Sequence, residues 1–76
     1  MYDFSVMFQP AEEGGYDVFV PALPGCVTQG DSLEEAKRMA EDAIRLYCES
    51  LIASGEPIPQ RSGEFVGHVR IAAEPA

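Results

Sequence analysis

The stretch GDSLEEA at residues 30–36 marks the start of the longest predicted element of the chain. Ser32 followed by Glu35 forms a capping box, in which the serine hydroxyl accepts from the Glu35 amide and the Glu35 carboxylate reaches back to the Ser32 amide. Acids in this first turn also complement the helix dipole. The pattern predicts a helix from Leu33 to Ser54, with Gly55 as its C-terminal stop.

The predicted helix is amphipathic along its whole length. Its apolar arc covers roughly 200°, which is wider than the stripe of about 100° that packing on one sheet requires. The members of this arc are Leu33, Ala36, Met39, Ala40, Ala43, Ile44, Leu46, Tyr47, Cys48 and Leu51. The arc therefore leaves two flanks over for another contact, Met39 and Leu46 on one side and Ile44 and Cys48 on the other.

Three segments before the helix show the two-residue period of strands. They are Tyr2–Gln9 and Tyr16–Val20, which form a predicted hairpin, and Cys26–Gln29, which is short and can form a third strand ended by Gly30. After the helix, Glu64–Ile71 returns to period two and predicts a fourth strand. The predicted fold is α+β, a two-layer β-β-β-α-β arrangement with one long helix on one face of a small, mostly antiparallel sheet.

Both faces of this predicted sheet carry apolar side chains. Met7 and Phe19 lie on the face opposite Phe4 and Val18, and one helix covers only one face. A chain of this size buries only about 60% of its surface on folding. We therefore expect a homo-oligomer. The predicted interface residues are Met7, Phe19, Met39 and Leu46.

The net charge of −8 is concentrated in the first half of the chain. Residues 1–36 hold seven acids and no Lys or Arg, whereas residues 37–76 hold six acids and five bases. Direct binding of nucleic acid is not expected, because phosphate binding needs a basic surface. The acidic half either serves solubility or steers a basic partner. In the second interpretation, the candidate partner-binding residues are Glu12, Glu13 and Asp17 at the hairpin.

No enzymatic or metal-binding constellation is apparent. His68 is the one histidine of the chain, and Cys26 and Cys48 form no CxxC pair. We therefore expect no catalytic residue, no cofactor and no bound metal. We also expect both cysteine thiols to be free. No apolar run approaches the roughly 18 residues of a membrane span. The N-terminus carries no basic segment typical of a secretory signal, which predicts a cytoplasmic protein without membrane contact.

Four ordered motifs resemble the HicB-like antitoxin family. They are GGY at 14–16, VPALPGC at 20–26, QGDSLEEA at 29–36 and PIP at 57–59. Ala22 stands where the family pattern usually has an acid, and Ser32 stands in place of Thr. The resemblance implies a partial RNase H-like fold that assembles into dimers or tetramers. It also implies a type II antitoxin that binds and masks HicA, a small basic toxin that cleaves mRNA.

Many relatives in that family carry a C-terminal ribbon-helix-helix or helix-turn-helix domain that binds promoter DNA. Here we expect a single HicB-like domain over residues 1–76, without such a DNA-binding domain. No acidic metal cluster at matched positions supports a nuclease. The alternative to a toxin-masking role is an orphan structural or regulatory module that acts through self-assembly or another protein partner.

Overall fold

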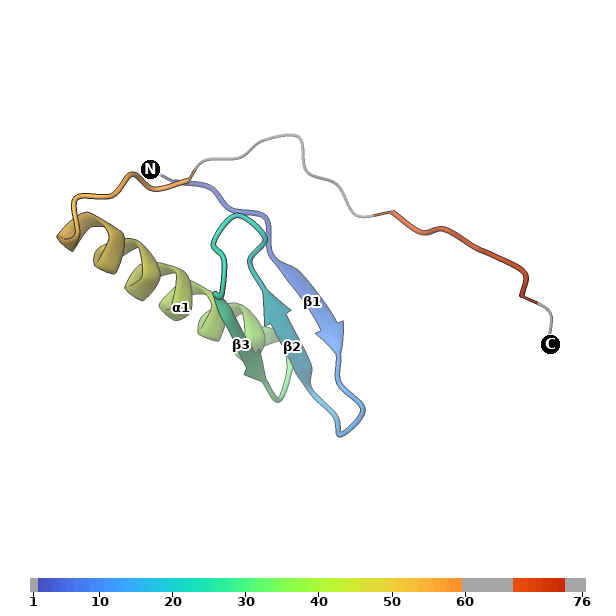
Figure 1. Cartoon of the computed structure of the whole chain (residues 1–76). Helices are drawn as coiled ribbons and strands as arrows, with labels where there is room; N and C mark the ends of the chain where they lie inside the picture. Colours follow the sequence, from blue (N-terminus) through green and yellow to red (C-terminus); the bar gives the residue numbers. More distant parts are fainter. Residues whose placement is uncertain (1, 60–66, 74–76) are drawn as a thin grey trace.

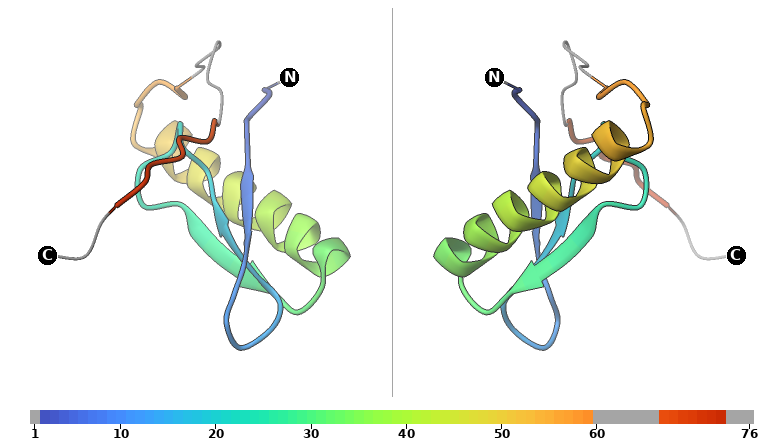
Figure 2. Two further views of the ribbon diagram at one scale, coloured as in Figure 1. Left: turned by 90° about the vertical axis from the view of Figure 1, so that its right-hand side faces the viewer. Right: turned by 90° about the vertical axis from the view of Figure 1, so that its left-hand side faces the viewer.

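The computed structural model describes residues 2–59 and 67–73, and contains three strands and one helix there (Figure 1). These elements are β1 (Met7–Pro10), β2 (Tyr16–Phe19), β3 (Val27–Gly30) and α1 (Leu33–Ala53). The strands form one antiparallel sheet in the order β1-β2-β3, and α1 lies across one face of it (Figure 2). The predicted α+β class, with a small antiparallel sheet and one long helix, is confirmed.

The first strand is shorter than its apolar alternation predicts. β1 begins at Met7, not at Tyr2, and it includes Pro10 as its last residue. The cause lies in the partner strand, since β2 ends at Phe19 and the Val20 amide donates to the Cys26 carbonyl at 3.2 Å. Residues 2–6 therefore have no strand opposite them. A proline is tolerated at the end of an edge strand because its missing donor interrupts no ladder.

The fourth strand predicted at Glu64–Ile71 is not formed where the chain is described. Residues 67–71 of that prediction carry no strand, and Val69 and Ile71 are 90% and 79% exposed. Residues 64–66 lie outside the described residues. The described segment 67–73 runs apart from the helix and sheet (Figure 1). Alternating side chains indicate a segment that is able to form a strand. The strand forms only when a neighbouring strand accepts and donates its backbone hydrogen bonds.

The core lies between the sheet and α1 and consists of two clusters. One contains Val18, Ala36 and Ala40, with Val6, Phe8 and Tyr16 packed against it. The other contains Val20, Leu23 and Cys26, packed against the N-terminal segment and the second half of α1. Because the buried helix residues are alanines, the backbone of α1 lies close to the strands.

The VPALPGC motif forms a tight turn that inserts a leucine into the core. Leu23 is fully buried, and its amide donates to the Val20 carbonyl at 3.0 Å. The Tyr47 hydroxyl of α1 donates to the Pro24 carbonyl at 2.8 Å. The proline-containing turn is thus fixed to the helix and sets the direction in which β3 leaves it.

The capping box forms with one difference from the expected pattern. The Ser32 hydroxyl accepts from the Glu35 amide at 3.1 Å, as predicted, but the Glu35 carboxylate accepts from the Asp31 amide at 2.8 Å instead of from Ser32. Either amide lies just before the first helical turn, so the carboxylate satisfies a donor there in both cases. The helix ends at Ala53, one residue earlier than predicted, and Gly55 follows with φ of +72°.

Ser32→Ala is expected to lower the free energy of unfolding by about 0.5–2 kcal/mol, since it removes the bond to the Glu35 amide. Chemical denaturation monitored by circular dichroism measures this change. Ser54→Ala is the matched control at the exposed end of the helix, with an expected change below about 0.5 kcal/mol. Equal stability of Ser32→Ala and the wild type would show that the cap contributes nothing.

Candidate partner-binding surfaces

The β1–β2 turn and the β3–α1 turn lie at the same end of the molecule (Figure 1). Their backbones touch, since a Cβ added at Gly15 would lie 2.5 Å from the Gly30 carbonyl oxygen. This contact brings the acids of the β1–β2 turn to the same end of the molecule as those of the β3–α1 turn and of the first turn of α1. We call this set the acidic end; it comprises Glu12, Glu13, Asp31, Glu34 and Glu35. All of them are exposed except Glu35, which is half-buried by its role in the cap.

Asp17, the third predicted partner-binding residue, is not at the tip of the hairpin. It is the second residue of β2 and is paired in register with Gln9 and Gln29. Val18 beside it is buried toward α1, so Asp17 faces the opposite side of the sheet. The structure therefore places Glu12 and Glu13 in one turn and Asp17 on the adjoining sheet face.

The sheet face opposite α1, called the open face below, carries an apolar row. Met7 pairs with Phe19, and Phe19 pairs with Val27. Phe19 is 36% exposed, Val27 is 60% exposed and Met7 is half-buried. This row adjoins the polar row that contains Asp17. The open face thus combines an apolar half with a polar half.

The two helix residues predicted for an interface lie on α1, away from the open face. Met39 and Leu46 are exposed on α1, and Leu46 is 67% exposed. α1 covers the inner face of the sheet, whereas Met7 and Phe19 belong to the open face. The four predicted interface residues therefore form two separate patches.

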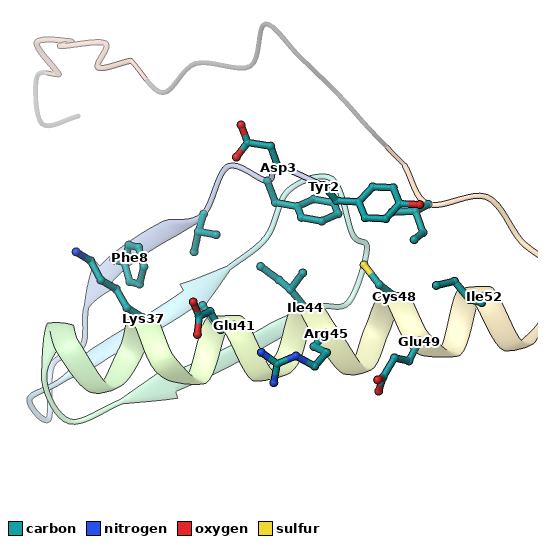
Figure 3. A pocket seen from close by; sticks show the side chains of 14 residues that line it. Tyr2, Asp3, Phe8, Lys37, Glu41, Ile44, Arg45, Cys48, Glu49 and Ile52 are labelled. Atoms are coloured by element: carbon teal, nitrogen blue, oxygen red, sulfur yellow. The ribbon is translucent and has the colours of Figure 1, made fainter.

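An apolar groove between the N-terminal segment and α1 is a third surface, and its helix wall includes the flank at Ile44 and Cys48 that the helix pattern leaves over for another contact (Figure 3). Its walls include Phe4 and Phe8 on one side and Ile44 and Cys48 on the other. The alternation of residues 2–8 was the available signal, because it places an apolar row at the edge of the sheet. The sequence predicts that row as part of a longer first strand, Tyr2–Gln9.

The metal-ligating and nucleophilic side chains of the described residues are spread over the fold. Across residues 2–59 and 67–73, no three His, Cys, Asp or Glu side chains gather as metal ligands. Cys26 and Cys48 are free thiols. Burial raises the pKa of the Cys26 thiol, and the neighbouring Cys48 raises it further. A catalytic cysteine needs the opposite shift, because the thiolate is the nucleophile.

His68 lies in the described segment 67–73 and is exposed. In the described part of the chain, α1 lacks the apolar length that crossing a membrane requires.

Several proteins of known sequence resemble this chain. A UPF0150 protein of Synechocystis is 45% identical over 60 residues, which cover 79% of this chain and 76% of that protein. A UPF0150 protein of Thermoplasma acidophilum is 46% identical over 63 residues, covering 83% and 91% of the two chains. A protein named Antitoxin HicB 1, from Photorhabdus laumondii, is 45% identical over 56 residues, covering 74% of this chain and 36% of that protein.

The sequence model of one family matches most of the chain. It is described as the HicB_like antitoxin of bacterial toxin-antitoxin system, and it matches residues 4–70. The matched region contains the whole sheet, α1 and both turns of the acidic end. The chain therefore belongs to the HicB-like antitoxin family, as its four motifs predict.

Proposed function

We propose that the chain is an antitoxin that binds a small basic toxin of the HicA type in the cytoplasm and masks its RNA-binding site. The observation that carries the proposal is the acidic end, where two turns and the first turn of α1 carry five acids at one end of the molecule. A ribonuclease that holds RNA presents basic side chains to phosphate. A surface of clustered carboxylates competes for the same side chains.

The charge of the acidic end is available to a partner. In the part of the chain that the structure describes, one ion pair is formed, between Arg45 and Asp42 at 3.3 Å, and both side chains are exposed on α1. None of the cations in these residues pairs with an acid of the acidic end or with Asp17. Opposite charges at the rim of an interface raise the association rate and fix orientation.

The relative from Photorhabdus supports the same role. Its printed name is that of an antitoxin, and its matched region corresponds to 74% of this chain. We infer that the helix-and-sheet body is the toxin-binding part of this chain.

Co-expression tests the proposal. A short basic open reading frame beside the gene is expressed in a bacterial host, alone and together with this chain. We expect arrested growth and mRNA cleavage with the basic protein alone, and restored growth with a purifiable complex when both are present. Growth arrest that persists in the presence of folded chain, with no complex, contradicts the proposal.

A second candidate, an orphan module that acts by self-assembly, is favoured by the apolar row of the open face. An orphan module binds no toxin, so the two roles are alternatives, but self-assembly of the chain is compatible with either of them. We expect sedimentation equilibrium at micromolar concentration to show species heavier than the 8.3 kDa chain. Phe19→Ser should weaken this association, because it removes the central side chain of the row. A single 8.3 kDa species in the wild type rules out self-assembly.

A further inference from the structure

Both cysteines of the chain belong to one core cluster, although they lie far apart in the sequence. Cys26 directly follows the turn between β2 and β3 and is a buried member of the cluster, together with Val20 and Leu23. Cys48 lies on α1 and packs against the same cluster. Both thiols are free. The fold therefore brings two thiols to the contact between the turn and the helix.

Hydrogen bonds fix the position of this turn relative to α1. The Cys26 amide donates to the Leu23 carbonyl at 2.9 Å, which holds Cys26 at the end of the turn. The Tyr47 hydroxyl donates to the Pro24 carbonyl at 2.8 Å, which joins the neighbour of Cys48 to the same turn. A disulfide needs Cβ atoms about 3.8 Å apart, so it forms readily only where the fold already holds two cysteines together. The turn and the helix meet this condition without a rearrangement of the core.

The two thiols differ in their access to solvent. Cys48 lines the groove between the N-terminal segment and α1, which has a volume of about 980 Å³, and its side chain points toward that segment (Figure 3). Where the chain is described, this end of the groove is open, since Ile52 is 63% exposed and Tyr2 is 56% exposed. Cys26 is buried, and burial together with the nearby Cys48 raises the pKa of its thiol. A small molecule that enters the groove therefore meets Cys48 first.

We propose that Cys26 and Cys48 form a redox-sensitive thiol pair, which closes to an intramolecular disulfide on reaction with a low-molecular-weight disulfide of the glutathione type. The Cys48 thiolate attacks one sulfur of glutathione disulfide, which forms a mixed disulfide and releases one glutathione thiolate. Cys26 then loses its proton to solvent and attacks the Cys48 sulfur, which breaks the mixed disulfide and releases the second glutathione thiolate. Two protein thiols are oxidised, and one glutathione disulfide is reduced to two thiols.

The bridge changes the stability of the chain and leaves the acidic end accessible. In a reducing compartment the pair stays open, and it closes when the fraction of oxidised glutathione rises. A bond between Cys26 and Cys48 ties the β2–β3 turn to the second half of α1 and restricts the unfolded chain. The β2–β3 turn lies at the end of the sheet opposite the β1–β2 turn (Figure 1). Closure therefore leaves the acidic turns unobstructed.

Reaction with glutathione disulfide tests the pair. The reduced chain is incubated with this probe, quenched with acid, and analysed by intact-mass spectrometry and non-reducing electrophoresis. We expect a monomer of 8.3 kDa that has lost two hydrogen atoms, carries no glutathione and shows no free thiol after unfolding. Cys26→Ser should stop at the mixed disulfide on Cys48. Cys48→Ser should react at least tenfold more slowly than the wild type, because the remaining thiol is buried.

The matched control moves the helix thiol by one position. Glu49 is exposed and also lines the groove, so Glu49→Cys combined with Cys48→Ser keeps an accessible thiol on the same turn of α1. We expect this variant to form the mixed disulfide but to close to Cys26 at least tenfold less. Equal closure in this variant and in the wild type overturns the proposal, because the fold then selects no partner for Cys26.

Three other results also overturn the proposal. The first is a mixed disulfide on Cys48 that persists in the wild type, the second is a covalent dimer as the main product, and the third is an absence of any reaction. Thermal unfolding gives a measurement that needs no variant. We expect the bridged wild type to unfold at least about 8 °C above the reduced form. Equal midpoints contradict a bond that ties the turn to the helix.

Discussion

Gly30→Ala is expected to lower the free energy of unfolding by about 3 kcal/mol, the upper end of the range for overpacking. A Cβ at this position would lie 2.5 Å from the Ala36 nitrogen and 2.6 Å from its Cα. These are backbone atoms of α1, so no side chain is able to move aside. The helix must shift away from β3, which also separates Ala36 from Val18 in the core. Denaturant unfolding measures the loss.

Gly25→Ala is the matched control for this prediction. Gly25 has φ of +80°, but an added Cβ meets nothing within 4 Å. The expected cost is therefore the backbone term alone, about 1–2 kcal/mol. A loss in Gly30→Ala no greater than that in Gly25→Ala would show that α1 adjusts freely on the sheet.

The same glycine shows which features the sequence could predict. Local signals predicted α1 to within one residue, because Ser32, Glu35 and Gly55 act within one turn of the helix ends. The close approach of Gly30 to Ala36 is a tertiary contact, and in the sequence this glycine only ends a strand. The predicted start of β1 at Tyr2, where the structure has Met7, is wrong for a related reason. Alternation describes the side chains of one segment, whereas a strand depends on its neighbour.

The candidate surfaces also divide into features that local sequence signals predict and features that depend on tertiary contacts. The hairpin predicted an exposed position for Glu12 and Glu13, and the structure confirms it. Their proximity to Asp31 depends on the Gly15–Gly30 contact, which joins residues far apart in sequence. The groove depends on where β1 begins and on which elements lie beside the N-terminal segment. No pattern within a single segment carries that information.

Neutralising Glu12, Glu13 and Asp17 together is expected to weaken binding of the basic toxin about tenfold to a hundredfold. The variant carries Ser, Ser and Asn at these positions. It removes three carboxylates that form no ion pair in the described chain, so stability should change little. Association should slow most, since rim charges act mainly on the encounter rate. Stopped-flow association and an RNA-cleavage assay measure the two effects.

The matched control removes three exposed acids from α1 and the segment after it, Asp42, Glu49 and Glu56. Both variants have the same net charge, so a difference between them reports position and not total charge. Raising salt from low to physiological concentration should slow association of the wild type and the control more than that of the first variant. If the first variant inhibits the toxin as well as the wild type, and salt has no effect, the acids serve solubility. An apolar surface must then hold the toxin, and the exposed flank of α1 at Met39 and Leu46 becomes the first surface to mutate.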